Sequence, residues 1–245
     1  MKEELVMKYG EIFYRYVNRT ARESAKEMMI PIIRKLAPCS IVDFGCGEGM
    51  WLHVASSFDN HIEILGLDGD YVDRSKLKIN ENAFVPTNIS KEVHLDRKYD
   101  LAISLEVGEH IDKDFADVYL DNLTNASDHI LFSAAIPGQG GKGHVNEQWQ
   151  SWWIKKFKER GFEPDFSVRN YFWNNNKIMF WYRQNVVFYS KTKDGPLFAD
   201  ADLYDVVHPD LFRESCSENG FRLGRFKRIF SGLVEESKLE KGRHV

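Results

Sequence analysis

The stretch that most constrains this chain runs from Ile41 to Gly49, where an apolar segment ends at an acid and glycine then occupies alternate positions. A short apolar run that ends in such a turn is typical of a buried strand that leads into a tight loop and then a helix. Gly45, Gly47 and Gly49 can adopt backbone angles closed to other residues, and they carry no β-carbon to keep a ligand from the main chain. The stretch therefore predicts a strand, loop and helix that bind a ligand, with a ligand-free tight connection as the alternative.

Apolar runs and helical segments alternate after this loop. Strands are expected at residues 62–67, 83–85, 99–105 and 129–135, and helices at 50–58, 71–80, 110–124 and 147–161. Five strands that alternate with helices predict parallel βαβ units in a doubly wound sheet. A last strand over 180–189 is expected to pair antiparallel at the sheet edge with the segment near Phe166. The predicted fold class is α/β, with a Rossmann-like, seven-stranded, mostly parallel sheet, helices on both faces and an antiparallel last strand.

The chain divides into three expected parts. Residues 1–37 form a helical N-terminal extension that ends at Pro38, residues 38–190 form the core, and residues 191–245 form a C-terminal extension. Aromatic residues in the first part could form a lid over a ligand, but a helix packed on the core is the favoured interpretation.

Composition narrows the possible partners. With 245 residues, a formal net charge of -4 and a pI of about 6.1, the chain has no global field that attracts nucleic acid or an anionic membrane. Its start lacks the apolar core of a signal peptide, and no run of about 18 apolar residues could span a bilayer. Three cysteines without metal-ligand spacing indicate free thiols. We therefore expect a cytoplasmic protein with no membrane or nucleic-acid partner, and the sequence does not indicate its oligomeric state.

A second acid supports a ligand at the glycine loop. Asp68 ends the second predicted strand about 20 residues after the loop, the spacing at which an acid accepts hydrogen bonds from ribose hydroxyls in nucleotide-cofactor sites. The loop departs from the dinucleotide pattern Gly-x-Gly-x-x-Gly, however, and it carries the acids Asp43 and Glu48. Acids here would repel a pyrophosphate and suit an ammonium or sulfonium group.

With these residues in view, the segment from Val42 to Gly49 resembles motif I of class I S-adenosylmethionine-dependent methyltransferases. Leu67-Asp68-Gly69 is similar to their ribose-binding segment, and Thr87-Asn88-Ile89 to their adenine-binding loop, although many relatives carry aspartate where this chain has Asn88. Glu-Val-Gly-Glu-His at 106–110 resembles a motif common in the branch that contains ubiquinone-biosynthesis O-methyltransferases. The resemblance covers about residues 38–190. It implies S-adenosyl-L-methionine as cofactor, bound by Asp43, Gly45, Cys46, Gly47, Gly49, Asp68, Gly69, Asn88, Ile89, Leu105, Glu106 and His110.

A weaker resemblance concerns the acceptor. Residues 143–148 and 181–185 are similar to segments of bacterial methyltransferases from glycan and natural-product gene clusters. This resemblance implies methyl transfer to a hydroxyl-type oxygen of a small polar acceptor, such as a sugar, an activated precursor or a natural product. Three alternatives stay open: N-methylation of an amine or amino sugar, a non-enzymatic nucleoside-binding regulatory module, and a nucleotide-dependent oxidoreductase.

His144 is the best candidate for a catalytic base, because it follows the fifth strand on the loop that should face the cofactor and an imidazole titrates in the useful range. We expect it to act together with Glu106. A role as an ordinary hydrogen-bonding loop residue is the alternative.

The same residues could bind a divalent metal such as magnesium, manganese or zinc. Glu106, Glu109 and His110 have i, i+3, i+4 spacing, which places three ligand-type side chains on one face if a helix begins there, and His144 could complete the set. The plant small-RNA 2′-O-methyltransferases use a similar Glu-x-x-Glu-His with a later histidine to hold a metal. The alternative is that Glu106 and His110 only line the cofactor pocket, as in metal-free relatives. The tryptophans at 149, 152 and 153 could form a wall for a ring substrate, although core packing is favoured for most of them.

Overall fold

The computed structural model describes residues 21–191, 195–198 and 205–211, and the chain separates into two compact units, residues 1–206 and 207–245. Every element below belongs to the first unit. In the described part of the second unit, residues 207–211, the backbone N–H of Asp210 donates to His208 Nδ1 at 3.2 Å.

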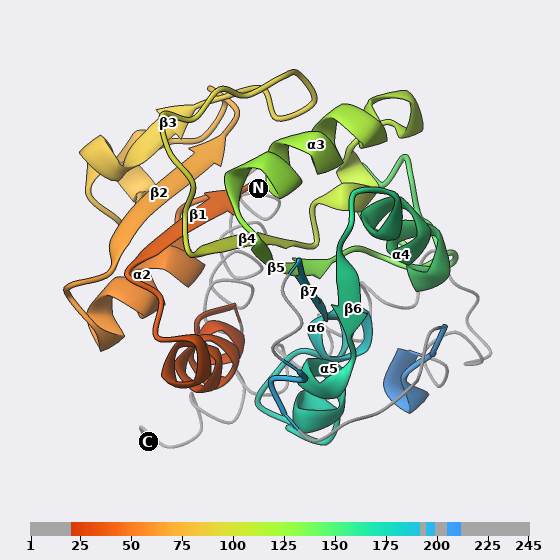
Figure 1. Ribbon diagram of the computed structural model, residues 1–245. Coiled ribbons are helices and arrows are strands. Elements are labelled where there is room, and N and C mark those ends of the chain that lie inside the picture. The colour runs from red at the N-terminus through yellow and green to blue at the C-terminus, as the bar shows by residue number, and fades with distance from the viewer. Residues whose placement is uncertain (1–20, 192–194, 199–204, 212–245) are drawn as a thin grey trace, which may run out of the picture. The chain divides into compact units, whose positions relative to one another are not determined.

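The first unit is built on a seven-stranded sheet with the strand order β3-β2-β1-β4-β5-β7-β6 (Figure 1). β7 runs antiparallel to both of its neighbours, and the pairs among β1 to β5 are parallel. The predicted fold class is confirmed. The strands are β1 (Ser40–Phe44), β2 (Glu63–Asp68), β3 (Phe84–Pro86), β4 (Leu101–Leu105), β5 (His129–Ser133), β6 (Glu163–Asp165) and β7 (Val187–Ser190).

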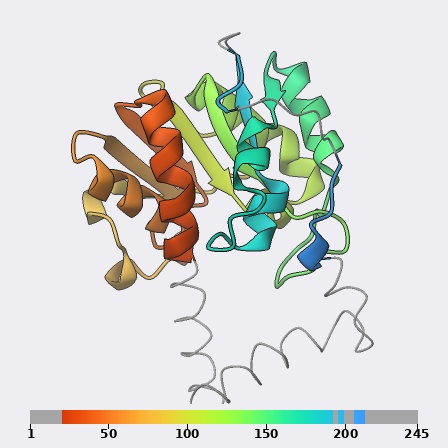
Figure 2. The same cartoon turned by 90° about the horizontal axis from the view of Figure 1, so that it is seen from below.

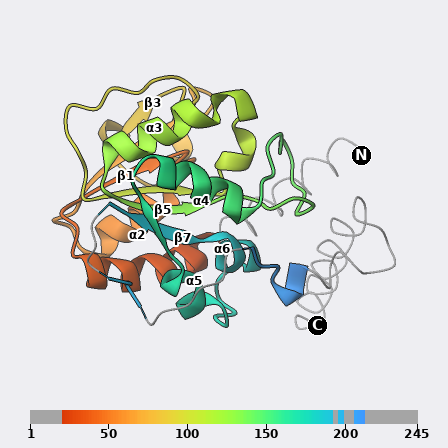
Figure 3. The same ribbon diagram turned by 45° about the vertical axis from the view of Figure 1, so that its right-hand side comes forward.

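Helices cover both faces of this sheet. The described α-helices are residues 21–36, α2 (Met50–Phe58), α3 (Ala116–Ala126), α4 (Gln150–Glu159), α5 (Ser167–Phe172) and α6 (Phe180–Asn185). Figure 3 shows α3 and α4 on one face and α2 and α5 on the other. In Figure 2 the helix of residues 21–36 lies across the second face, beside α2.

The core is two-sided because neighbouring strand residues point to opposite faces. Ile41 packs in the cluster that contains Met28 and Leu52, whereas Val42 packs in the cluster that contains Leu120 and Phe157. Strands buried on both faces read as continuous apolar runs, which is why the sequence revealed them. The helix of residues 21–36 packs on the core as favoured, while the aromatic residues proposed for a lid lie outside the described residues.

Two predicted elements are wrong. Residues 71–80 form no α-helix, because the side chains of Asp73 and Asn80 accept backbone N–H groups and cap short 3-10 turns instead. Residues 180–189 form a strand only in their second half, since Phe180, Arg183 and Gln184 are buried at the i, i+3, i+4 spacing of helix α6. The expected antiparallel pairing with the segment near Phe166 is confirmed, but β7 lies inside the sheet and β6 is the edge strand on that side.

The helix expected at 110–124 begins later. A 3-10 turn over Gly108–His110 follows β4, a second one covers Lys113–Phe115, and α3 starts at Ala116. The helix expected at 147–161 is the shorter α4, in which Trp153 is 2% exposed and lies in the core, whereas Trp149, just before α4, is 41% exposed.

The topology decides where a ligand can bind. The carboxyl ends of β1, β2, β4 and β5 lie at one edge of the sheet, and the start of β7 meets the same edge because Val187 pairs with Phe132 near the end of β5. In open α/β sheets, ligands bind at this edge. No helix within the described ranges is long and apolar enough to cross a membrane.

Candidate functional site

The loop after β1 has a backbone that favours glycine. The φ angle is +84° at Gly45, +54° at Gly47 and +80° at Gly49. A β-carbon at Gly45 would lie 2.5 Å from Val107 Cγ2, whereas one at Gly47 would meet no atom within 4 Å. Packing therefore closes the loop at Gly45 and leaves it open at Gly47, where a ligand can lie on the main chain.

Asp68, the last residue of β2, faces this loop. Its Oδ2 accepts the N–H of Gly47 at 2.7 Å, and its Oδ1 accepts the N–H of Gly69 at 2.7 Å. Oδ1 also accepts the hydroxyl of Tyr71 at 2.6 Å. The carboxylate predicted to bind ribose thus lies against the glycine loop, and it already holds a hydroxyl group there.

Asp43 lies below the loop with an unsatisfied oxygen. The residue is 2% exposed, and its Oδ2 has no hydrogen-bond partner among the described residues. Burial, followed by the nearby charge of Asp68, holds the pKa of the Asp43 carboxyl well above its usual range. A buried carboxylate in this state is stabilised by any cation or donor that reaches it.

The other residues predicted for the cofactor site lie around the same strand ends. Asn88 is exposed after β3, and its Oδ1 accepts the N–H of Ser90 at 3.0 Å. Ile89 and Leu105 are buried, at 9% and 8% exposure. The thiol of Cys46 is free and buried, and burial and two neighbouring carboxylates raise its pKa.

Glu106 follows β4 and is held by amides from two distant segments. Gln139 Nε2 donates to its carboxylate at 3.0 Å, and Asn185 Nδ2 donates at 3.0 and 3.2 Å to the two oxygens. Burial raises the pKa of Glu106, while hydrogen bonds from Asn185, Ser133 and Gln139 lower it. Its φ of +56° is uncommon for a residue with a side chain. The structure thus fixes Glu106 by hydrogen bonds that no motif indicated.

The helical face expected to join Glu106 to Glu109 and His110 is absent, and this prediction is wrong. Glu106 has a left-handed backbone, and the turn that follows is a 3-10 turn rather than the start of α3. The i, i+3, i+4 argument therefore fails for Glu106, which turns to Gln139 and Asn185.

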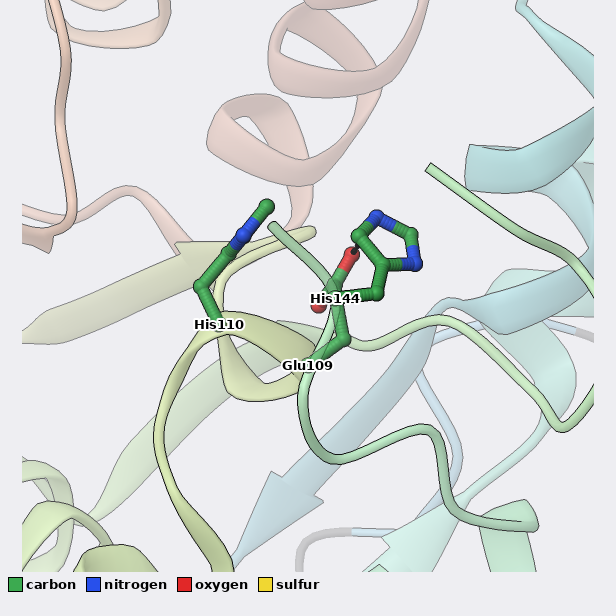
Figure 4. A group of neighbouring side chains, drawn as sticks. All are labelled: Glu109, His110 and His144. Carbon is green, nitrogen blue, oxygen red and sulfur yellow. Dashed lines mark ion pairs between the residues drawn. The ribbon is translucent and has the colours of Figure 1, made fainter. Parts of the chain in front are cut away.

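The structure does bring together three of the four predicted metal ligands. Glu109, His110 and His144 each offer a ligand atom, and these atoms all lie within 4.8 Å of one another. His144 Nε2 lies 3.9 Å from Glu109 Oε1, and the two imidazole rings are 5.0 Å apart. Figure 4 shows Glu109 and His110 on the turn after β4 and His144 on the loop after β5.

The charges of this cluster favour a cation. Glu109 is 1% exposed, and its Oε2 has no hydrogen-bond partner within the described part of the chain. Burial, with the charges of Glu106 and Glu147, raises the pKa of Glu109 well above its usual range. Burial lowers the pKa of His110, which favours the neutral imidazole that binds metals.

A family comparison identifies the fold. Residues 11–176, more than half of the chain, match the model of a family described as a methyltransferase domain. The chain belongs to this methyltransferase family. Its cofactor is therefore S-adenosylmethionine, and the residues around the glycine loop fit that molecule because they offer open main chain, a hydroxyl-binding carboxylate and an unsatisfied buried carboxylate.

Solved methyltransferases share the fold at low sequence identity. The sugar N-methyltransferase KedS8 from Streptoalloteichus is 11% identical with a TM-score of 0.56, over 75% of this chain and 92% of that one. An O-methyltransferase family protein from Burkholderia thailandensis is 10% identical with a TM-score of 0.53, over 76% and 60%. Magnesium protoporphyrin IX methyltransferase from Synechocystis, solved with bound SAH, is 15% identical with a TM-score of 0.52, over 74% and 88%. A sequence comparison with curated proteins finds no match.

Several residues of this methyltransferase site were missed by sequence reasoning. Gln139 and Asn185 hold Glu106, Tyr71 lies on Asp68, and Glu147 bonds His144. The segments that contain Asn185 and Glu147 were noted only for their similarity to segments of bacterial methyltransferases, and no role was predicted for either residue. A usable signal was the glycine-rich stretch before His144, which predicts a loop able to offer backbone N–H groups.

Proposed function

We propose that this methyltransferase transfers a methyl group to a hydroxyl-type oxygen of a small polar acceptor, such as a sugar, an activated precursor or a natural product. The observation that carries the proposal is the placement of His144, which is 13% exposed and shares the site with Glu109 and the cofactor-binding edge of the sheet. A hydroxyl group becomes a better nucleophile when a positioned base takes its proton, and His144 offers an imidazole for that step.

The cofactor would supply an electrophilic methyl group on its sulfonium sulfur. For its binding, the chain offers the open backbone at Gly47, the Asp68 carboxylate for ribose hydroxyls and the buried Asp43 carboxylate for positive charge. Asn88 and Ile89 follow β3 beside this site, where we assign them to the adenine ring. Holding both substrates in line supplies much of the rate of a displacement reaction.

We propose that Glu109, His110 and His144 can also bind a divalent cation. A carboxylate and two imidazoles suit zinc or manganese, and an ion there would lower the pKa of an acceptor hydroxyl. Glu106 belongs to a separate role in this proposal, because its oxygens accept hydrogen bonds from Gln139 and Asn185. In this role Glu106 borders the acceptor side of the site and acts on the reacting groups through its charge.

Chelation separates the two roles of His144. The enzyme is treated with excess chelator, dialysed and assayed before and after addition of zinc, manganese or magnesium. Loss of activity with recovery on one metal supports the metal site. Full activity in excess chelator would rule out the metal site and leave His144 only the role of a base.

N-methylation of an amine or amino sugar is the second candidate. The unsatisfied Oε2 of Glu109 favours a ligand that donates a hydrogen bond on the acceptor side, as an amine N–H can. The formal net charge of -4 and the buried acids Asp43 and Glu109 weigh against a nucleic-acid acceptor.

Acceptor screening with methyl-labelled cofactor tests the whole proposal. Hydroxyl compounds and sugar nucleotides come first, and matched amino sugars follow. Label on oxygen supports O-methylation, and label only on nitrogen replaces it by the second candidate. Tight cofactor binding without labelling of any compound in a broad panel would favour a regulatory module.

A further inference from the structure

The loop between β5 and α4 holds one carboxylate with its backbone. The N–H of Gly138 donates to Glu147 Oε2 at 2.8 Å, and the N–H of Gly140 donates to Glu147 Oε1 at 2.7 Å. Gly138 and Gly140 have φ angles of +84° and +67°, which residues with side chains rarely adopt. The glycines of this stretch therefore shape a loop that fixes Glu147.

Glu147 is in turn bonded to His144. Its Oε1 lies 2.8 Å from His144 Nδ1, and the two side chains are 20% and 13% exposed. Both oxygens of Glu147 already accept backbone N–H groups, so the residue has the bonding pattern of a carboxylate, which accepts and does not donate. The hydrogen in the contact with His144 must then reside on Nδ1, and in the neutral imidazole the lone pair is on Nε2.

The same loop also contacts Nδ1 of His110. His110 Nδ1 lies 3.2 Å from the carbonyl oxygen of Gly143. A carbonyl oxygen can only accept, so this contact also places the hydrogen on Nδ1 and leaves Nε2 free. Both imidazoles of the cluster thus offer the same ring nitrogen.

Gly141 lies against the Nε2 side of the His144 ring. A β-carbon at Gly141 would lie 2.1 Å from His144 Nε2, a separation that no real structure tolerates. The imidazole therefore rests against bare backbone, and its position depends on glycine at 141.

We propose that Glu147 is a positioning residue that holds His144 in the tautomer with hydrogen on Nδ1 and directs Nε2 toward Glu109 and the acceptor. This inference rests on the proposed function for its catalytic consequence, because Nε2 is the atom that His144 would use either as a base or as a metal ligand. The tautomer itself is a property of the free protein. Outer-shell carboxylates of this kind typically contribute roughly 10- to 100-fold in activity.

The direct test is the tautomer of His144 in Glu147→Gln. The full chain, labelled with nitrogen-15 in histidine and treated with chelator, is studied by long-range proton–nitrogen correlation, and the signal is assigned by its loss in His144→Asn. We expect a single tautomer with unprotonated Nε2 in the unaltered protein and a mixture in Glu147→Gln. Because the amide oxygen can still accept the two bonds that use Oε1, from Gly140 and His144, Glu147→Ala is measured beside it; this variant accepts none of the three hydrogen bonds and should also give a mixture.

Kinetics give the second readout. We expect kcat of Glu147→Gln to fall roughly 10- to 100-fold while the cofactor Kd stays unchanged. Glu92→Gln is the matched control, because Glu92 lies 3.8 Å from His94 Nε2 but both side chains are exposed, at 77% and 83%. This control should change neither the His144 signal nor kcat.

Gly141→Ala tests the placement of His144 independently of Glu147. It leaves Glu147 intact and inserts a methyl group where Nε2 lies, so the His144 signal should shift and kcat should fall.

The outcomes separate this proposal from the proposed function. An unchanged His144 tautomer in Glu147→Ala overturns the positioning role, whatever happens to kcat. A changed tautomer with unchanged kcat supports the positioning role and overturns the use of His144 in the reaction.

Discussion

The two halves of the functional edge are built in different ways. The half at the ends of β1 and β2 uses main-chain atoms and the carboxylates of Asp43 and Asp68, and Gly47 and Asp68 meet there because the paired strands place them together. The half at the ends of β4 and β5 uses side chains from distant segments, such as Glu106 and Asn185, which are 79 residues apart. Strand register assembles the first half, and loop conformation assembles the second.

This difference predicts different responses to mutation. Substitutions in the first half should change cofactor binding, and substitutions in the second should change turnover with the cofactor still bound. The following tests are ordered from the largest expected effect to the smallest.

Removal of the imidazole in His144→Ala should lower kcat by roughly 100- to 10,000-fold, the usual contribution of a positioned acid or base. The cofactor Kd, measured by calorimetric titration, should not change. His61→Ala is the control, because His61 is exposed in the turn before β2. A loss of cofactor binding in His144→Ala would mean that the two halves are not separable.

A side chain at Gly47 should block the first half. In Gly47→Val the new atoms enter open space above the loop, so the cofactor Kd should rise roughly 100-fold, in line with the cost of overpacking. Gly195→Val is the matched control, because Gly195 also has a positive φ, of +80°, with no atom within 4 Å of a β-carbon. Retained binding in Gly47→Val, with equal losses of stability in both variants, would move the cofactor away from the loop.

The buried acids of both halves should make the cofactor-free protein less stable as pH rises. The pKa values of Asp43 and Glu109 are raised in the folded state, so their contribution is greatest below the ordinary carboxyl pKa and is lost as pH rises through the folded values. The Tm of chelated, cofactor-free protein should therefore fall between about pH 5 and pH 8, by roughly 2–4 °C for each kcal/mol of folding free energy that is lost.

Asp43→Asn should flatten that slope, because it removes one of the buried acids with a raised pKa. Asp96→Asn, at an exposed position, should leave the slope unchanged. Equal slopes in the unaltered protein and in Asp43→Asn would contradict the assignment of a raised pKa to Asp43.

The smallest effect is expected at Tyr71, whose hydroxyl bonds the Asp68 oxygen that ribose would use. In Tyr71→Phe this competition disappears, so the cofactor should bind roughly 2- to 10-fold more tightly, the value of one hydrogen bond. Tyr171→Phe is the control, since Tyr171 is exposed and stacks on Phe198. Weaker binding in Tyr71→Phe would show instead that Tyr71 contacts the cofactor.

The same contrast explains what the sequence could predict. Gly47 and Asp68 follow apolar strands at a known spacing, so both the strands and their meeting point were predictable. The helix predicted over 71–80 was wrong because the side chains of Asp73 and Asn80 bond to backbone N–H groups and favour short 3-10 turns over an α-helix. The strand predicted over 180–189 was wrong in its first half because a short amphipathic helix, α6, precedes the strand.

The second half was predicted only in part. Glu109, His110 and His144 come together as expected, but the helical spacing that motivated the group does not exist at Glu106. The bonds of Glu106 to Gln139 and Asn185 depend on tertiary contacts, which no pattern of neighbouring residues records. The cytoplasmic location, the domain boundaries and the acceptor stay predictions.

The insertion of β7 between β5 and β6 has a consequence for synthesis of the chain. A nascent chain released as far as β4 already contains the glycine loop and Asp68, but Asn185 emerges about 80 residues after Glu106. Because a domain generally folds as a unit, and Val186 and Phe188 pack in the same core cluster as Ile41, the first half cannot complete its core until β7 has left the ribosome. Both halves of the functional edge therefore form in the same late step of synthesis.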